Sequence, residues 1–329
     1  MDNMKIKTHE GKSFFGSSDS SILDTAIRSG LRFEHSCNTG QCGVCKIELL
    51  SGEVTELKSQ LALTDSDIKK RQILSCCCSP KTDLVIVAED LVQLNGINVQ
   101  TLPSRIKEIY RLTKHLVKVC LRFPPTSNFN FLEGQFIDVI GPNGIKRSYS
   151  IASTAKNSEV ELYIKRFENG LMSDYWFNKA RENDLLRIEG PKGTFFLRDM
   201  SVDLIFLATG TGIAPILSIL KGLDDNPNFV QKNSIKLYWG NRFIEDFFLY
   251  GPFKNIKVEI IKVLSRETSE CGFLYGYVQD IALIENFGLH NTEVYACGSN
   301  TMIVDAKKKF INAGIPQNKF YSDAFLQSY

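Results

Sequence analysis

The sequence has no run of eighteen apolar residues, the length that a membrane-spanning helix needs. Its first twelve residues alternate polar and apolar side chains and include no apolar signal core. These absences predict a protein that does not cross a membrane and is not exported, so we expect it in the cytoplasm.

A strong charge of one sign is also missing. The chain has 39 Lys and Arg against 37 Asp and Glu, a formal net charge of +2, and its basic residues are scattered along the chain. Proteins that bind nucleic acids or membrane surfaces usually gather such residues into runs. We therefore expect neither a nucleic acid nor a membrane as a partner.

What is present is typical of a globular protein: 43% hydrophobic and 23% charged residues. A chain of 329 residues exceeds one ordinary core, which predicts two or three domains. The chain also has nine cysteines. Without an export signal these predict metal ligands or free thiols rather than disulfides.

The first segment, residues 1–92, reads as short strands around one helix. Ser20 or Ser21 is placed to cap a helix over 22–28, and Gly30 is placed to end it. An apolar strand at 84–87 closes the segment. The polar, turn-rich stretch that follows predicts a linker over 93–102.

Two further domains are predicted after the linker. Over 103–200, strand patterns at 136–140 and 160–165 favour an antiparallel barrel. Over 201–329, continuous apolar strands at 204–208 and 258–261 alternate with helical stretches, which predicts a parallel sheet. One such helix is indicated by the apolar positions 303, 306, 310 and 313. The fold class is multidomain, α+β and α/β.

Cys37, Cys42 and Cys45 follow the spacing C-x4-C-x2-C of a plant-type 2Fe-2S ferredoxin. Two bridged irons need four thiolates converging on one point, and Gly40 and Gly43 let the loop wrap closely. A structural zinc site usually shows two matched C-x2-C pairs, which this spacing does not. Spacing alone leaves the fourth ligand open among Cys76, Cys77 and Cys78.

Arg147, Ser148, Tyr149 and Ser150 match the R-x-Y-[ST] signature of the ferredoxin-NADP reductase superfamily. A bound flavin needs a cation for its pyrophosphate, an aromatic face and a hydroxyl near N5. Arg147, Tyr149 and Ser150 resemble these roles in that order. The alternative is an exposed strand in which Arg and Tyr alternate with small residues.

A second flavin loop is predicted where Gly170, Leu171, Met172 and Ser173 open a helical stretch. The unpaired N–H groups at a helix start suit a pyrophosphate. By itself this pattern is only a helix cap. Arg166, on the preceding strand, adds charge to the same site or is merely solvated.

A nucleotide loop is predicted at Gly210, Thr211 and Gly212, which follow an apolar strand and precede a helix. Pro215 stands where the ordinary dinucleotide fingerprint has its third glycine, and the resulting form resembles the same superfamily. Cys297 and Gly298 resemble its Cys-Gly pair beside the nicotinamide. The alternative for Cys297 is a buried thiol at a strand end.

The choice between NADH and NADPH depends on the stretch after the next strand. Glu245 and Asp246 follow Arg242 there. A carboxylate near the ribose repels a 2′-phosphate and accepts from a free hydroxyl, whereas Arg242 favours the phosphate. We expect a preference for NADH.

Taken in order, these motifs resemble reductases that join three parts: a ferredoxin-like β-grasp module, an FAD-binding barrel and an NAD-binding domain. The resemblance implies that Cys76, which closes Ile73-Leu74-Ser75-Cys76, is the fourth cluster ligand. Cys77 and Cys78 are then ordinary thiols, and Cys120 and Cys271 packing residues. Phe325, near the carboxyl end, is expected to shield the flavin face.

The implied electron path runs from NADH to FAD, then to the 2Fe-2S cluster and to a partner enzyme docked at the ferredoxin module. Stretches 147–153, 188–198 and 318–325 resemble the family of CDP-6-deoxy-Δ3,4-glucoseen reductases. These supply a pyridoxamine-phosphate-dependent dehydrase of CDP-3,6-dideoxyhexose biosynthesis, which serves lipopolysaccharide. One alternative is the reductase component of a multicomponent oxygenase. The second alternative is a ferredoxin-like binding module without catalysis.

Overall fold

The computed structural model describes residues 3–155, 159–248, 252–268, 272–286 and 288–325. The chain divides into two compact units, one ending at Ile97 and the other running from Asn98 to Phe325. None of the helices in these described ranges has the length and apolar character needed to cross a bilayer.

The first unit is built on a five-stranded sheet in the order β2-β1-β7-β3-β5. β1 runs parallel to β7, and the other neighbours are antiparallel. The elements are β1 (Met4–Thr8), β2 (Ser13–Gly16), α1 (Ile22–Arg28), β3 (Lys46–Ser51), β4 (Val54–Glu56), α2 (Asp65–Lys69), β5 (Gln72–Leu74), β6 (Cys78–Pro80), β7 (Leu84–Val87) and η1 (Val92–Leu94). β4 and β6 form a separate antiparallel pair.

Helix α1 forms as its sequence predicts. The Ser21 hydroxyl accepts from the Asp24 backbone N–H at 3.0 Å and caps the helix. After the helix ends, Gly30 has a φ of +85°, which a glycine adopts without strain. Ile22, Leu23 and Ala26 are buried in the core of the unit and fix the helix on the sheet.

The second unit begins with a six-stranded antiparallel sheet in the order β11-β10-β13-β8-β9-β12. Its elements are β8 (Gln100–Thr113), β9 (Leu116–Arg122), β10 (Phe136–Ile140), η2 (Pro142–Gly144), β11 (Lys146–Ser150), β12 (Glu159–Lys165), α3 (Leu171–Asp174), η3 (Tyr175–Lys179) and β13 (Leu185–Lys192). An antiparallel bridge between Ile151 and Leu162 links the two ends of this order and closes the sheet into a barrel.

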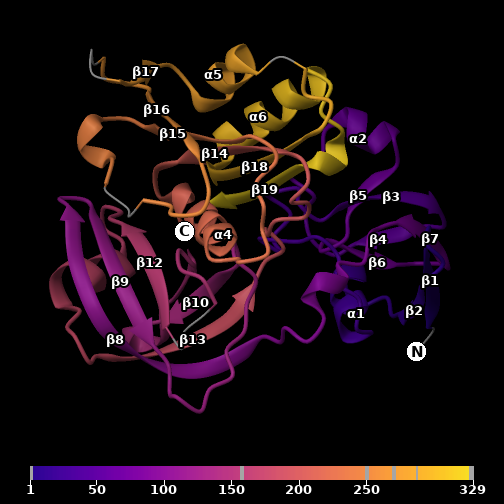
Figure 1. Cartoon of the computed structure of the whole chain (residues 1–329). Helices are drawn as coiled ribbons and strands as arrows, with labels where there is room; N and C mark the ends of the chain where they lie inside the picture. The colour runs from indigo at the N-terminus through magenta and orange to yellow at the C-terminus, as the bar shows by residue number, and fades with distance from the viewer. Residues whose placement is uncertain (1–2, 156–158, 249–251, 269–271, 287, 326–329) are drawn as a thin grey trace. The chain divides into compact units, whose positions relative to one another are not determined.

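The rest of the second unit is a six-stranded parallel sheet in the order β17-β16-β15-β14-β18-β19. Its elements are β14 (Asp203–Thr209), η4 (Gly210–Gly212), α4 (Ile213–Asp224), β15 (Ile235–Asn241), η5 (Ile244–Asp246), β16 (Glu259–Leu264), β17 (Leu274–Tyr275), α5 (Val278–Glu285), β18 (Thr292–Ser299), α6 (Asn300–Asn312), η6 (Gln317–Lys319) and β19 (Phe320–Phe325). Figure 1 shows α4 on one side of this sheet and α5 and α6 on the other.

The order of the parallel sheet creates a site. From β14 the chain adds strands outward to β17 on one side, and then returns to add β18 and β19 on the other. Ligands of open α/β sheets bind at the carboxyl ends of the strands where the order reverses. In this chain that point is the end of β14, which is followed directly by Gly210.

Helix α4 joins the parallel sheet to the barrel. The Ser218 hydroxyl donates to the Ser153 carbonyl at 2.6 Å, and the Lys221 ammonium donates to the Ala152 carbonyl at 2.9 Å. Lys221 also pairs with Glu161 of β12 at 2.8 Å. A helix that packs on both parts fixes the nucleotide loop relative to the barrel.

Three element boundaries differ from the sequence expectation. β8 begins at Gln100, inside the stretch expected to be a linker, and η1 includes its first two residues. The strand expected at 258–261 is displaced and runs over Glu259–Leu264. These strands begin where a neighbour offers hydrogen bonds, β13 for Gln100 and β15 for Glu259, which a single-strand pattern does not reveal.

Candidate cluster, flavin and nucleotide sites

The structure brings Cys37, Cys42, Cys45 and Cys76 together as two pairs of thiols. The Cys45 thiol donates to the Cys76 sulfur at 3.1 Å, and the Cys42 thiol donates to the Cys37 sulfur. This hydrogen bond from Cys42 lowers the pKa of Cys37, and the one from Cys45 lowers the pKa of Cys76. The same hydrogen bonds raise the pKa of the two donor thiols, Cys42 and Cys45.

The loop that holds these thiols aims backbone N–H groups at their sulfurs. Thr39 N donates to the Cys37 sulfur at 3.4 Å, Val44 N donates to Cys42, and Gly40 N donates to Cys76. Gly40 has a φ of +78°, and a Cβ there would lie 2.3 Å from the Ser59 carbonyl oxygen. Only glycine lets the loop adopt this path.

This donor set fits a 2Fe-2S cluster. Two irons bridged by sulfide each take two cysteine thiolates, which corresponds to two thiol pairs. Among the described residues, no group of three or more His, Cys, Asp or Glu side chains is placed to hold a metal ion, so the fit rests on the ligand type and on the pairing of the thiols. Backbone donors around the sulfurs suit an anionic cluster.

The remaining cysteines differ in their surroundings. Cys77 and Cys78 are both fully buried in the first unit, and the Cys77 sulfur lies 3.5 Å from that of Cys76. Cys120 is buried on β9, and its thiol lies 3.7 Å from a Glu159 carboxylate oxygen. Cys271 lies outside the described residues.

The predicted flavin residues lie on β11, at the edge of the barrel where the chain leaves β10. Tyr149 is half-buried, and its hydroxyl oxygen accepts from Trp176 Nε1 at 2.9 Å. Burial raises the pKa of Tyr149 to about 12, so its hydroxyl keeps its proton. Ser150 is buried, whereas Arg147 is half-buried and donates to the Lys146 carbonyl. Ser148 is exposed and donates to Asp138 at 2.5 Å.

The second predicted flavin loop forms the start of α3. Gly170 is its N-cap, Leu171 is 65% exposed, and Met172 is buried in the barrel core. The Ser173 hydroxyl accepts from the Phe167 N–H at 2.9 Å, which fixes the loop before the helix. The N-cap residue is a glycine and has no side chain that could accept a hydrogen bond from the first turn. The backbone N–H groups at the helix start therefore stay available for an anion.

Arg166 lies beside this loop and has a second function as a packing residue. Its guanidinium lies 5.5 Å from the ring centre of Phe177, and Arg111 lies at the same distance from that ring. Arg166 is itself exposed. An exposed cation next to a helix start fits the predicted contact with a pyrophosphate.

Two glycines close the nucleotide loop, Gly212 in η4 and Gly298 near the end of β18. A Cβ on Gly212 would lie 2.2 Å from the Cys297 carbonyl oxygen, and a Cβ on Gly298 would lie 2.1 Å from Thr209 Oγ1. Gly210 has a φ of +56° with open space around it. The ends of β14 and β18 thus approach closely because no side chain lies between them. The space beside Gly210 is open, so a ligand can reach the loop there.

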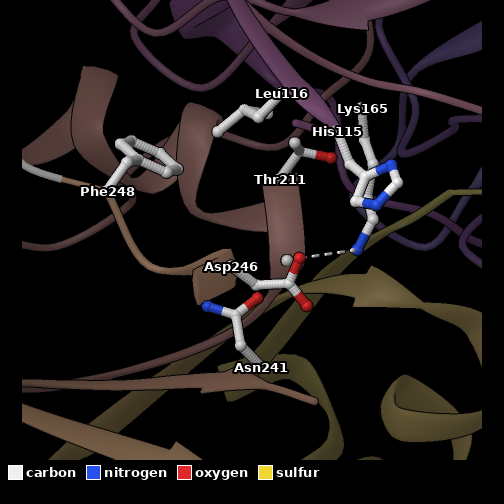
Figure 2. Close-up of a pocket in the computed structure, with 8 residues that line it drawn as sticks. His115, Leu116, Lys165, Thr211, Asn241, Asp246 and Phe248 are labelled. Atoms are coloured by element: carbon white, nitrogen blue, oxygen red, sulfur yellow. Dashed lines mark ion pairs between the residues drawn. The ribbon is translucent and has the colours of Figure 1, made fainter. Parts of the chain in front are cut away.

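A small cleft lies between this loop and the barrel. Figure 2 shows Lys165 next to His115, with the Lys165 ammonium 3.7 Å from the Asp246 carboxylate. The cleft is lined by His115, Leu116, Lys165, Gly210, Thr211, Asn241, Asp246 and Phe248.

Sequence reasoning singled out Gly210, Thr211 and Asp246 but missed the cleft's other residues. Lys165 is the last residue of the predicted strand and stands directly before Arg166. Its position at the strand end could therefore have identified it as a candidate site residue. Asn241 likewise ends β15. No pattern in the sequence indicated that His115, in the turn between β8 and β9, lies in the same cleft.

Other predicted residues do not line this cleft. Arg242 and Glu245 follow β15 and are exposed. The Cys297 side chain is fully buried in a core cluster, and burial raises its pKa. Its carbonyl, rather than its thiol, contacts the nucleotide loop. Phe325 ends β19 opposite Ser299 and is 38% exposed, so its predicted contact with the flavin stays a prediction.

Family models match all three parts of the chain. The 2Fe-2S iron-sulfur cluster binding domain matches residues 7–81, the oxidoreductase FAD-binding domain matches 103–197, and the oxidoreductase NAD-binding domain matches 206–308. Each match covers the segment in which the cluster, flavin or nucleotide residues were predicted.

Similar proteins extend over the whole chain. The CDP-6-deoxy-L-threo-D-glycero-4-hexulose-3-dehydrase reductase of Yersinia pestis is 36% identical, with 99% of both chains covered. The propane 2-monooxygenase reductase component of Mycolicibacterium smegmatis is 29% identical, covering 93% of this chain and 92% of that protein.

Among solved structures, the Amycolatopsis cytochrome P450 reductase GcoB has a similar fold. Its TM-score is 0.74 at 23% identity, with 98% of both chains covered. With the two thiol pairs, the flavin strand and the glycine-closed nucleotide loop, these findings define an NAD(P)H-dependent oxidoreductase that uses FAD and a 2Fe-2S cluster. The chain belongs to the ferredoxin-NADP reductase superfamily, in the group of flavoprotein reductases that carry an N-terminal plant-type 2Fe-2S module.

Proposed function

We propose that this reductase oxidises NADH and delivers electrons singly to the pyridoxamine-phosphate-dependent dehydrase of CDP-3,6-dideoxyhexose biosynthesis. The observation that carries this choice is the 36% identity, across 99% of both chains, to the reductase of a CDP-6-deoxyhexulose dehydrase. The oxygenase reductase component reaches 29%.

The flavin residues bind and orient FAD in this proposal. FAD, when bound, accepts a hydride as two electrons and releases them one at a time. Arg147 and the start of α3 at Gly170 to Ser173 bind its pyrophosphate, with Arg166 adding positive charge. Tyr149, held by Trp176, packs against the ring, and Ser150 supplies a hydroxyl near N5.

The nucleotide residues bind NADH at the end of β14. Gly210, Thr211 and Gly212 approach its pyrophosphate, and Gly298 and Cys297 lie at the neighbouring strand end. Glu245 is exposed beyond β15, where a carboxylate accepts from a free 2′-hydroxyl and repels a 2′-phosphate. Asp246 faces Lys165 in the cleft, which leaves Glu245 as the stronger candidate for selecting NADH.

The partner enzyme docks on the first unit, next to the cluster loop. The segment beside this loop exposes two apolar side chains, Leu57 at 40% and Leu61 at 69%. Its backbone is fixed to the cluster site, because Leu57 N donates to the Cys77 carbonyl and Ala62 N donates to the Gly40 carbonyl. Exposed apolar side chains held rigidly beside an electron exit suit a transient protein contact.

Reconstitution with candidate acceptors tests this function. The purified reductase is mixed with NADH and either the dehydrase with its substrate or an oxygenase with its substrate, and NADH consumption is followed. Acceptor-dependent turnover with the dehydrase alone is the expected result. Turnover with the oxygenase alone contradicts the proposal. A purified chain without FAD, or without NADH-dependent bleaching of the flavin, would instead indicate a binding module.

A leucine substitution tests the docking face. Leu61→Asp should raise the KM for the dehydrase while leaving NADH-dependent ferricyanide reduction unchanged, because ferricyanide needs no protein contact. Ile68→Asp, at an equally exposed position on α2, is the matched control. Equal effects of the two substitutions would contradict docking at the cluster loop.

A further inference from the structure

Cys77 is a further buried thiol at the cluster site, beside the predicted ligands. Its side chain is fully buried, and its sulfur lies 3.5 Å from the Cys76 sulfur. A Cβ on Gly40 would lie 2.8 Å from the Cys77 sulfur, so the cluster loop passes directly over this thiol. Cys77 is therefore enclosed between a predicted ligand and the loop that carries the other three.

The backbone of Cys77 is held on both sides. Its N–H donates to the Leu74 carbonyl at 2.8 Å, and its carbonyl accepts from Leu57 N at 2.7 Å and from Lys58 N at 3.2 Å. These bonds fix the backbone of Cys77, and with it the direction in which its Cβ leaves the chain. The other acceptor near the thiol, the Ser59 carbonyl oxygen, is farther away at 3.8 Å.

The chemistry of the ligand decides which of the two sulfurs donates the hydrogen bond. A cysteine that binds iron does so as a thiolate and has no proton to donate. Cys77 binds no iron under this assignment, and its buried thiol lies within hydrogen-bond distance of the Cys76 sulfur, at 3.5 Å. The hydrogen between the two sulfurs must then belong to Cys77.

We propose that Cys77 is a positioning residue that donates an S–H hydrogen bond to the Cys76 sulfur and thereby raises the reduction potential of the cluster. The proposal rests on the assignment of Cys76 as the fourth ligand. Reduction adds negative charge to the cluster, and a hydrogen bond to a ligand sulfur stabilises that charge. Cys77 therefore favours electron transfer from the flavin onto the cluster.

Cys78, the next residue along the chain and the first of β6, provides a matched comparison. It is as deeply buried as Cys77, and it pairs with Glu56 in the β4–β6 ladder. Within the described ranges, no hydrogen bond joins the Cys78 thiol to the Cys76 sulfur. Removing the Cys78 thiol thus measures the effect of losing a buried thiol group without losing a hydrogen-bond donor to the Cys76 sulfur.

The experiment measures the midpoint potential of the cluster in the full-length holoprotein by an EPR-monitored redox titration. The variants are Cys77→Ala, Cys77→Val, Cys77→Ser and Cys78→Ala. Cys77→Ala and Cys77→Val should lower the equilibrium constant for cluster reduction about tenfold, which is about 59 mV for one electron. Cys77→Ser retains a donor and should recover most of the potential, and Cys78→Ala should match the unmodified protein.

Other outcomes overturn the proposal in distinguishable ways. Unchanged potentials in both Cys77→Ala and Cys77→Val would exclude the hydrogen bond while leaving the ligand assignment intact. Equal shifts in Cys77→Val and Cys77→Ser would assign the effect to packing. Loss of iron and of the visible cluster spectrum in all three Cys77 variants, together with their retention in Cys76→Ala, would make Cys77 the ligand itself. None of these results depends on the identity of the partner enzyme.

Discussion

The cluster loop and the nucleotide cleft are two redox sites assembled in opposite ways. Three of the four predicted cluster cysteines lie in one stretch, 37–45, and the predicted fourth follows at Cys76. The cleft takes its lining from residues between His115 and Phe248, and these come from the barrel as well as the parallel sheet. One site is local in sequence and the other is made by tertiary structure.

This difference affects how each site tolerates change. The cluster site depends on a few thiols and on a loop whose path requires Gly40. The nucleotide site depends on close approach of two strand ends, with individual side chains each contributing less. We expect single substitutions in the cluster loop to abolish electron transfer through the cluster. Single substitutions in the cleft should weaken NADH binding, each by a limited amount.

The largest effect is expected from Cys42→Ala. Loss of one of the four thiolates should remove the cluster, so NADH-dependent reduction of cytochrome c should fall by orders of magnitude. Reduction of ferricyanide, which takes electrons from the flavin directly, should stay near its original rate. The two rates are compared in the same preparation, with iron content as the check on cluster loss.

A fragment that begins at Asn98 should reproduce this split, because it contains the whole second unit. It retains every predicted flavin and nucleotide residue and lacks the cluster. If the fragment reduced the cognate partner at the full-length rate, the flavin would be the electron exit, and the proposed path through the cluster would be wrong.

A smaller but still severe effect is expected from Gly212→Ala. The new Cβ would meet the Cys297 carbonyl oxygen at 2.2 Å, and backbone atoms on both strands must shift to accommodate it. We expect about 2–3 kcal/mol less free energy of unfolding, as for overpacking of a core, and at least about a tenfold rise in KM for NADH. Chemical denaturation and steady-state kinetics measure the two effects.

Gly210→Ala is the matched control for that substitution. Gly210 has a positive φ but open space around it, so alanine should cost only about 1 kcal/mol, through backbone strain. Equal losses of stability at positions 210 and 212 would contradict the close strand contact as the cause.

A change in cofactor choice is expected from Glu245→Gln. Removing the exposed carboxylate should improve kcat/KM for NADPH relative to NADH by about tenfold, or about 1.4 kcal/mol. Asp246→Asn, at the residue that pairs with Lys165, should change this ratio less. A native protein that prefers NADPH would refute the assignment at once.

The smallest effect is expected from Lys165→Met in the cleft. The ion pair with Asp246 is 3.7 Å long, and the lysine side chain is 38% exposed, so stability should change by less than about 1 kcal/mol. Because Lys165 faces the nucleotide loop, we expect a few-fold rise in KM for NADH with kcat little changed. Lys118→Met, on β9 and paired with Glu161, is a control lysine of the same unit that does not line the cleft.

Local sequence was sufficient for much of the fold. The Ser21 cap predicted the start of α1, and the alternation over 160–165 predicted β12. The apolar runs of the third segment predicted parallel strands, which the sheet order confirms. Boundaries were less accurate where a strand such as β8 begins because a partner strand lies beside it.

Motif reasoning proposed sites wherever the residues are adjacent in the chain. The spacing of Cys37, Cys42 and Cys45 indicated a cluster, and the structure adds the pairing of Cys45 with Cys76 that spacing left open. Cys77 received no role from the sequence, because two neighbouring thiols look alike until the fold directs one of them at a ligand.

The sequence by itself determined the three-part order and the cofactors, since each depends on residues close together in the chain. Only the tertiary structure decided that His115 and Lys165 line the same cleft as Asp246, and that Gly212 and Gly298 allow the ends of β14 and β18 to approach closely. These contacts join residues far apart in sequence. No local propensity encodes them, because they arise from sheet order and from the packing of α4 against the barrel.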